Sequence, residues 1–258
     1  MTQTSCYLNI NKFSLFVNIY VLTFYEVSKG KSLHNPYKSR DPSLFMQFTT
    51  HPRASTEMRE SMDAYGIGPA LQEQFTRCIS FHTVTAPGLF IGVFMVDYAL
   101  ELLGARHGEK LYAIAETYKC IPDPVQVMAG CTFGNHRLQV VPIGKFALTM
   151  NRPSEREAIE GIRVFVDAEK LRKYRIIHAW YTHSPGFDSR TMIYPLIDEI
   201  LKAGRDILSY QRVRVNVPLK RSWKSVRCTT CGEMVPDIAL DGDQCKGCGS
   251  LSYYDVVQ

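Results

Sequence analysis

The sequence lacks an apolar run long enough to cross a membrane. The candidate stretch, residues 13–25, contains Asn18, and it is well short of the roughly 20 apolar residues that a spanning helix needs. Only Lys12 precedes this stretch, and no small-residue cleavage pattern follows it, so a secretion signal is not indicated. We therefore expect a cytoplasmic protein with reduced thiols and no membrane segment.

A large excess of one charge is also missing. The 30 Lys and Arg residues against 25 Asp and Glu residues leave a net charge of +5, which is too small to indicate nucleic-acid binding by itself. Eight cysteines in 258 residues are too few for a disulfide scaffold. A composition that is 45% apolar and 21% charged excludes wholesale disorder. The length indicates one large domain, or a core with a small module.

Residues 1–50 show no strong helical period, and we interpret them as a poorly structured N-terminal extension. An alternative is that Met46 is the natural start and that residues 1–45 come from an over-long gene prediction. From Arg53 onward the pattern changes. Ser55 followed by Glu57 indicates a helix start, and a second short helix is expected over residues 71–78.

The centre of the chain alternates helices and strands. Leu89, Val93, Val96 and Leu100 have helical spacing, and Gly104 suits the position just past the end of a helix over residues 88–103. The remaining expected elements are a strand at 111–117, a helix at 122–130, two strands at 138–142 and 145–150 joined by a tight turn at 143–144, a strand at 161–166, a helix capped by Asp167 and ending near 173, a helix at 188–201, and an exposed strand at 212–217.

The strongest motif is C-terminal. Cys228, Cys231, Cys245 and Cys248 form C-x2-C-x13-C-x2-C, and a glycine follows each pair. This spacing predicts a tetrahedral zinc ribbon in preference to two disulfides or four free thiols. Because four sulfurs close the coordination sphere, the zinc is expected to be structural and not catalytic.

The stretch before the ribbon is basic. Residues 212–227 hold six basic residues, no acidic residue and Trp223. They could form a phosphate-binding face, so nucleic acid is a conceivable partner. We favour the simpler interpretation that this is a solvated basic linker.

A second cluster of chemistry lies at residues 119–135. Cys120 precedes a predicted helix, where the helix dipole is expected to lower its pKa and make it a ligand or a nucleophile. Cys131 lies eleven residues later, about 15 Å away if the helix is continuous, which is too far for a disulfide. Cys131 therefore acts elsewhere, acts across a dimer interface, or packs as a small buried hydrophobe.

A family resemblance rests on these residues. Residues 81–89 and the run Cys120-x-x-Asp123-x-x-Gln126-x-x-x-Gly130-Cys131-Thr132-Phe133-Gly134, followed by Gly144-Lys145, resemble the FmdE family, named after the E component of formylmethanofuran dehydrogenase. The resemblance covers about Arg53 to the end, since many members also carry a C-terminal cysteine ribbon.

The resemblance implies an α+β fold, with a core of order α-β-α-β-β-β, a mixed sheet and a small zinc ribbon. It implies an FmdE-like domain over 51–222 and a ribbon over 223–258. It also implies a homodimer, a second transition-metal site near His82 and Cys120, and a link to a molybdenum or tungsten redox enzyme of one-carbon, methanogenic metabolism. Within the resembling run, Gln126, Cys131 and Thr132 are candidate cofactor-binding residues.

This chain departs from the family pattern at two positions. The family has His-x-His-x-Cys-Pro-Gly before the long helix, whereas this chain has Val84 and Ala86 in place of the second His and the Cys. Neither side chain can bind a metal. His82, Cys120 and Asp123 remain, which implies a weaker, more open metal site or none. The remaining histidines that could compensate are more typical of ordinary surface or core positions: His136, His178 and His183.

Three functions are compatible with these patterns. The first is a dimeric metal-binding accessory protein that handles metal, sulfur or a cofactor, with Cys120 as thiolate, His82 as ligand or base, and Asp123 as its partner. The second is a thiol-dependent enzyme acting on a small cofactor in the same cleft, with Cys120 as nucleophile. The third is a zinc-ribbon regulator or interaction protein that has lost the central site.

Overall fold

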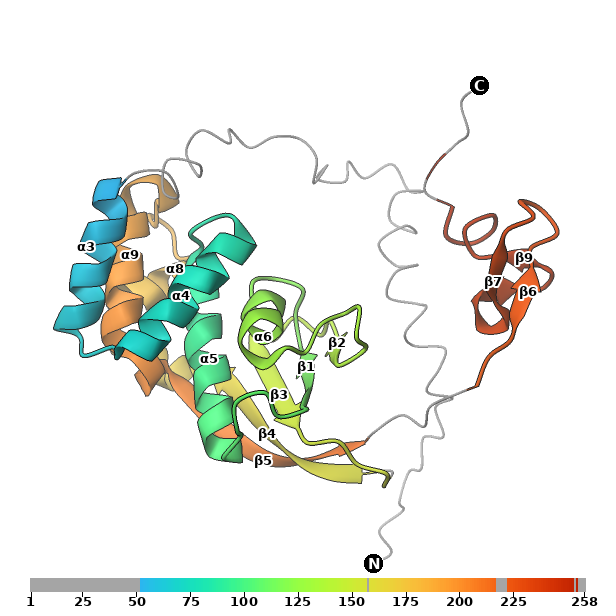
Figure 1. Ribbon diagram of the computed structural model, residues 1–258. Coiled ribbons are helices and arrows are strands. Elements are labelled where there is room, and N and C mark those ends of the chain that lie inside the picture. The colour runs from blue at the N-terminus through green and yellow to red at the C-terminus, as the bar shows by residue number, and fades with distance from the viewer. Residues whose placement is uncertain (1–51, 157, 217–221, 253, 255–258) are drawn as a thin grey trace, which may run out of the picture. The chain divides into compact units, whose positions relative to one another are not determined.

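The computed structural model describes residues 52–156, 158–216, 222–252 and 254 (Figure 1). The expected N-terminal extension, residues 1–50, lies outside the described residues. Two compact units divide the chain between residues 219 and 220, and we call them the core unit and the ribbon unit. No helix in the described ranges combines the length and the apolar character that crossing a bilayer would require.

The core unit contains seven helices and one five-stranded sheet within the described residues. The helices are α3 (Pro52–Ala64), α4 (Pro69–His82), α5 (Pro87–Leu103), α6 (Pro122–Ala129), α7 (Ala168–Leu171), α8 (Arg175–Tyr181) and α9 (Ser189–Ala203), with a short 3-10 turn at Gly204–Ile207. The strands are β1 (Tyr112–Ala115), β2 (Leu138–Val140), β3 (Ala147–Asn151), β4 (Ala158–Val166) and β5 (Leu208–Asn216).

The sheet has the order β2-β1-β3-β4-β5. Strand β2 runs parallel to β1, and the other neighbours are antiparallel. The helix–strand–helix order followed by three strands and the mixed sheet are therefore as the sequence predicted, and the α+β class is confirmed.

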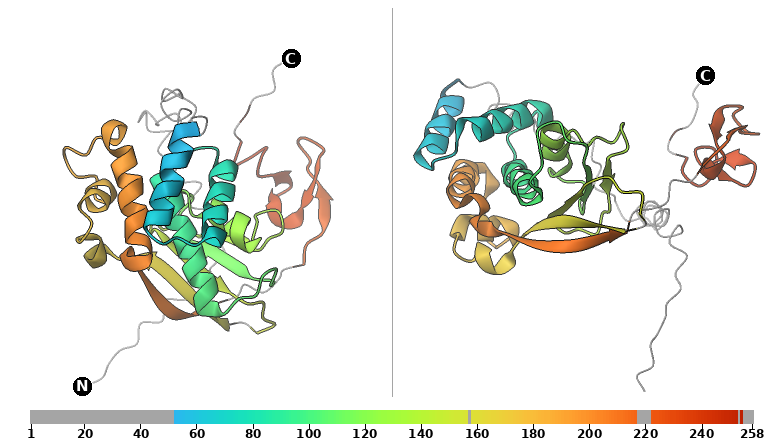
Figure 2. Two further views of the ribbon diagram at one scale, coloured as in Figure 1. Left: turned by 60° about the vertical axis from the view of Figure 1, so that its left-hand side comes forward. Right: turned by 60° about the horizontal axis from the view of Figure 1, so that its bottom comes forward.

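Helix α5 crosses one face of this sheet and forms the centre of the core (Figures 1 and 2). It is apolar on every side, which is the pattern of a buried helix, and every residue from Pro87 to Val96 is buried. Phe75 of α4 packs on Phe90 and Phe94 of α5, with ring centroids 5.3 and 5.2 Å apart. The first turn of α6 packs against α5 in the same layer, and this places Cys120 and Asp123 beside the core.

The predicted tight turn between residues 142 and 145 does not produce a hairpin. Strands β2 and β3 lie on opposite sides of β1, because α6 is the crossover of a β-α-β unit and brings β2 parallel to β1. The Gly144 N–H donates to the Glu116 carbonyl, so the turn passes over the end of β1. The prediction of two strands was right, and their adjacency was wrong.

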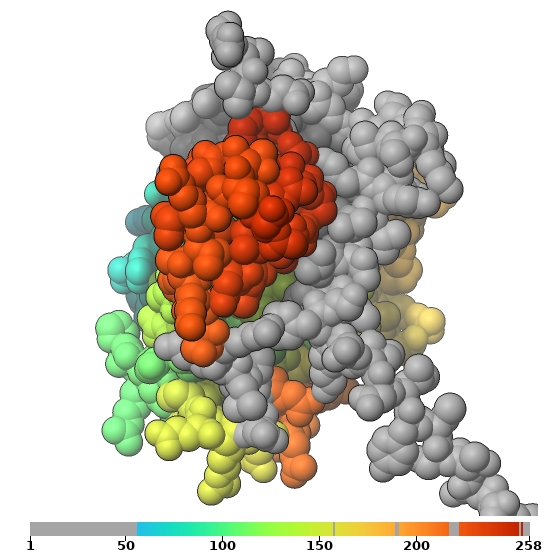
Figure 3. Space-filling model, turned by 90° about the vertical axis from the view of Figure 1, so that its right-hand side faces the viewer, coloured from blue at the N-terminus to red at the C-terminus, as the bar shows by residue number. Residues whose placement is uncertain are grey.

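The ribbon unit is built from very short elements (Figure 3). Its described strands are β6 (Ser225–Arg227), β7 (Met234–Pro236), β8 (Leu240–Asp241) and β9 (Gln244–Cys245), with a 3-10 turn at Asp237–Ala239. They form two hairpins, β6–β7 and β8–β9. Only Cys228 and Cys245 are buried among the described residues of this unit, so apolar packing alone supplies little stability to it.

Candidate metal centre and the His82–Asp123 site

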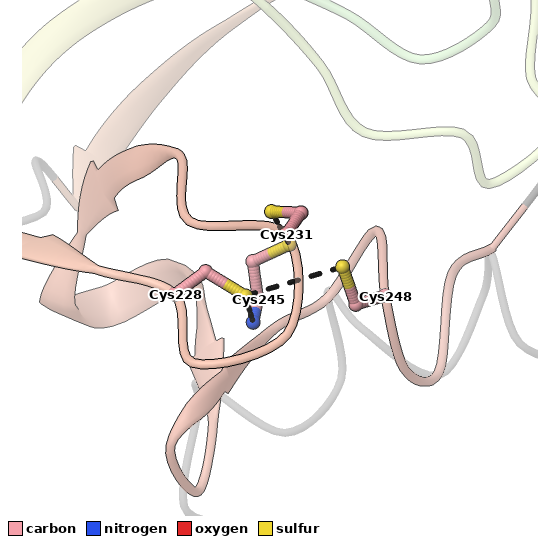
Figure 4. A group of neighbouring side chains, drawn as sticks. All are labelled: Cys228, Cys231, Cys245 and Cys248. Carbon is pink, nitrogen blue, oxygen red and sulfur yellow. Dashed lines mark hydrogen bonds between the residues drawn. The ribbon is translucent and has the colours of Figure 1, made fainter.

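The four ribbon cysteines converge on one point (Figure 4). Cys228 and Cys231 lie at the turn between β6 and β7, and Cys245 and Cys248 lie at the end of β9 and in the turn after it. All four sulfurs lie within 4.8 Å of one another. Gly232 has a φ of 78°, a left-handed conformation that favours glycine and lets the chain turn back after Cys231.

The sulfur–sulfur distances fit a tetrahedral ion. Cys228 Sγ lies 3.9 Å from Cys248 Sγ, and Cys231 Sγ lies 4.0 Å from Cys245 Sγ. Four sulfurs at about 2.3 Å from a central zinc are about 3.8 Å apart. The cysteines of this cluster are all free, so the alternative of two disulfides is not found. The cluster can hold a metal ion, as the spacing predicted.

The backbone prepares one thiolate in this cluster. The Cys245 N–H donates to Cys228 Sγ at 3.2 Å. Hydrogen bonds from the backbone N–H groups of Cys231 and Cys245 lower the pKa of Cys228 to about 6. A thiolate is the form of cysteine that binds metals, so at neutral pH the first ligand is already ionised.

The second site joins the last residue of α4 to the first turn of α6. His82 ends α4, and its Nδ1 lies 2.5 Å from Asp123 Oδ2. Gln126, one turn further along α6, donates to the other Asp123 oxygen at 3.4 Å. The His82 and Asp123 side chains are 18% and 27% exposed, so the pair is partly shielded and still reachable from solvent. The predicted association of His82 with Asp123 is a direct contact.

Cys120 borders the same carboxylate, but its thiol is not activated. It lies two residues before α6, where the sequence placed it. Burial, followed by the charge of Asp123, raises the pKa of Cys120 to about 11. The expected lowering is therefore wrong for this site without a metal: α6 is only eight residues long, and its dipole does not offset desolvation. A protonated thiol is a poor nucleophile, which disfavours the thiol-dependent enzyme.

Two residues at this site have left-handed backbones. Cys120 has a φ of 52°, and Thr83, directly after His82, has a φ of 64°. Each such conformation costs about 1–3 kcal/mol for a residue other than glycine. Strain of this kind is found preferentially at functional sites, and here it fixes the two chain positions that carry His82 and Cys120.

Cys131 and Thr132 do not lie at this site as ligand-binding groups. Cys131 is fully buried, and its Sγ donates to the Leu111 carbonyl at 3.2 Å. Thr132 and Asn135 exchange two hydrogen bonds of 3.0 and 3.1 Å, which close the loop after α6. Of the alternatives for Cys131, packing as a small buried hydrophobe describes it within one chain. Gln126 contacts the site through Asp123.

Within the described residues, no second group of three ligating side chains matches the closeness of the ribbon cluster. Val84 and Ala86 supply no ligand atom, as the sequence indicated. The sequence reasoning also missed two arginines, Arg77 and Arg137, which bond to carbonyls at the end of α6. Gly130, which ends α6 with a φ of 61°, was the available signal, because helix ends leave carbonyls that need donors.

Comparisons with known proteins agree with this geometry. A family model described as "FmdE, Molybdenum formylmethanofuran dehydrogenase operon" matches residues 81–215. A crystal structure of an FmdE-like protein of tungsten formylmethanofuran dehydrogenase, from Syntrophus aciditrophicus, matches with a TM-score of 0.60 and 36% identity. The match covers 71% of this chain and 95% of that one.

A curated relative gives a different description. A probable S-adenosyl-L-methionine-binding protein of Archaeoglobus fulgidus is 31% identical over 209 residues, which is 72% of this chain. This chain therefore spans 56% of the length of that relative.

Proposed function

Since this chain belongs to the FmdE family, we propose that it is a metal-binding accessory protein. It handles metal, sulfur or a cofactor for a molybdenum or tungsten redox enzyme of one-carbon metabolism, and it works as a cytoplasmic homodimer. The family's association with such an operon supports the partner. We assign no reaction to the chain itself, since its central thiol is protonated at neutral pH.

The observation that carries this proposal is the four-sulfur cluster. Its sulfur spacing suits a zinc ion, and four protein ligands leave no open position for a substrate. Zinc is therefore structural in the ribbon unit, and the ribbon presents its exposed surface to a partner.

The core unit offers a second and weaker metal site. The carboxylate of Asp123 bonds His82 Nδ1, which leaves Nε2 as the ligand atom. This is the usual arrangement of a metal-binding histidine and its orienting carboxylate. Cys120 Sγ is the other ligand, and Asp123 acts through His82. Two protein ligands leave open positions, which fits weak or exchangeable binding of a transition metal.

Metal analysis of the purified chain tests both sites. We expect one tightly bound zinc per chain that is lost in Cys228→Ser and retained in His82→Ala. A second equivalent, added as Co2+ and read by its visible absorption, should be lost in His82→Ala and Cys120→Ser. The matched control is His183→Ala, an exposed histidine, which should retain both.

Two results would contradict the proposal. Full cobalt binding in His82→Ala would remove the central metal site. Absence of metal from the wild-type ribbon, including after reconstitution under reducing conditions, would remove the structural zinc.

A second candidate is the regulator or interaction protein that uses only its ribbon. It is favoured by the exposure of Trp223 and Met234, which are 55% and 62% exposed, beside the basic residues Lys224 and Arg227. Single-stranded nucleic acid binds such surfaces by stacking and charge. Affinity that falls steeply between two salt concentrations would support this candidate, and no binding at low salt would exclude it.

A further inference from the structure

A cavity of about 440 Å³ lies between α4, the end of α5 and the end of α6. Its wall includes the last turn of α6, Val127 to Gly130, so it lies at the opposite end of that helix from Cys120 and Asp123. Small-molecule sites are about 300–1,000 Å³. The cavity is large enough for a small ligand, and neither metal site accounts for it.

The acidic side chains of this cavity are already neutralised. Asp97 pairs with Arg205 at 2.5 Å, and Glu109 pairs with Arg152 at 2.6 Å. Both carboxylates line the cavity, while neither Arg205 nor Arg152 does. The acids therefore contribute little net charge to a ligand inside.

Two arginines in the wall carry the uncompensated charge. Arg137 donates to the Gly130 carbonyl at 2.8 Å, and Arg77 donates to the Val127 carbonyl at 3.5 Å. Within the described part of the chain, neither has a carboxylate partner. Each carbonyl contact uses only part of a guanidinium's donors, so both groups retain N–H groups for an oxyanion.

The contacts to α6 also hold these two groups in place. Arg77 comes from α4 and Arg137 from the segment before β2, and both converge on one helix end. Guanidinium groups fixed in advance lose less entropy when they bind an anion than free surface side chains do. The remaining wall is apolar, with Leu71, Leu100, Leu111 and Met128, and it suits a hydrocarbon or aromatic body.

We propose that this cavity binds a small organic anion, whose carboxylate or phosphate is held by Arg77 and Arg137 and whose apolar body packs on the leucines. If the arginines only capped α6, their donors would be satisfied by its carbonyls, and the cavity would show no preference for an anion. Charge selectivity therefore separates the two roles.

The test is an NMR titration of the full chain labelled with 15N. The probes are phenyl phosphate and benzoate, with benzyl alcohol as the uncharged probe of similar shape. We expect both anions to shift the amides of Val127, Gly130 and Gly108 saturably, and benzyl alcohol to bind at least about tenfold more weakly, since one charge-assisted contact is worth that factor. Binding of only one anion narrows the ligand to phosphate esters or to carboxylates.

Two variants and a control complete the test. Arg137→Gln and Arg77→Gln should each weaken binding at least about tenfold. Arg172→Gln, an exposed arginine just after α7 with a 69% exposed side chain, should leave binding unchanged. Arg77 makes the longer carbonyl contact, so its variant keeps the test valid if Arg137→Gln disturbs the end of α6.

Three results overturn the proposal: no saturable shift, equal binding of benzyl alcohol, or unchanged affinity in both arginine variants. None of these readouts depends on metal content, so this inference and the proposed function can fail separately.

Discussion

The ribbon unit and the core unit achieve order in different ways. In the ribbon unit the described strands are two or three residues long, and the buried residues are two cysteines. In the core unit a buried helix, α5, packs on a five-stranded sheet. The first unit therefore depends on four sulfurs around a metal, and the second depends on apolar burial.

The same residue type has opposite chemistry in the two units. Backbone N–H groups lower the pKa of Cys228 to about 6. Burial raises the pKa of Cys78 to about 12 and those of Cys120 and Cys131 to about 11. Sequence position alone did not separate these environments, because a thiol's pKa is set by what packs around it.

Metal removal should break the comparison most strongly. Chelation, or Cys228→Ser, should unfold the ribbon unit and leave the core unit folded, since metal binding supplies about 10 kcal/mol or more in such modules. In 1H–15N NMR spectra the dispersed amide signals of residues 222–252 should collapse while those of residues 52–216 stay in place.

The matched control for this prediction is Thr230→Ser, which alters the same cysteine turn without removing a ligand. It should keep both the metal and the spectrum. Loss of core signals on chelation would show that the two units are not energetically separate.

The core unit should respond instead to the loss of a shielded ion pair. Arg163 donates to both Glu116 oxygens, at 2.6 and 2.8 Å, and the two side chains are only 17% and 10% exposed. Arg163→Met leaves Glu116 without this partner and should cost about 3 kcal/mol in the free energy of unfolding. Urea unfolding measures this cost, and metal content should not change.

The double variant Arg163→Met with Glu116→Leu is the control. It removes both charges and should recover part of the loss. An unchanged urea midpoint in the single variant would mean that the pair adds nothing to the core.

Most of the fold was predictable because its signals are local. Asp167 accepts hydrogen bonds from the N–H groups of Glu169 and Lys170, and Gly104 ends α5 in a left-handed conformation, as the sequence indicated. Helix α8 was not predicted. Its first N–H groups, at Ile176 and Ile177, donate to Glu199 of α9, and a cap supplied by a distant residue has no local signal.

The candidate sites divide in the same way. The ribbon cluster followed from spacing, since four cysteines in two tight turns specify their own geometry. The position of Cys120 before a helix was also readable, but its burial depends on α5 and Phe146. The cavity arginines were missed because Arg77 and Arg137 are sixty residues apart and meet only through the end of α6.

Alkylation should distinguish the two kinds of cysteine in one experiment. At pH 8, iodoacetamide should label Cys120 at least about tenfold more slowly than an ordinary thiol, because a pKa of about 11 keeps it protonated and the greater nucleophilicity of its thiolate offsets this only in part. The rate should rise with pH toward about 11. Peptide mass spectrometry after chelation should show fast labelling of the ribbon cysteines only. Fast labelling of Cys120 at pH 8 would contradict the raised pKa.

The smallest expected effect tests how Cys120 is buried. A Cβ at Gly88 would lie 3.0 Å from Cys120 Sγ and 3.3 Å from Phe146 Cζ. Gly88→Ala should therefore destabilise the core unit by about 1 kcal/mol, because overpacking outweighs the helix propensity gained. Cys120→Ala removes the sulfur, and the double variant should be more stable than the sum of the single effects by about 0.5 kcal/mol or more. Strictly additive effects would show that α5 and the Cys120 sulfur are not in tight contact, and the raised pKa would then lack its main cause.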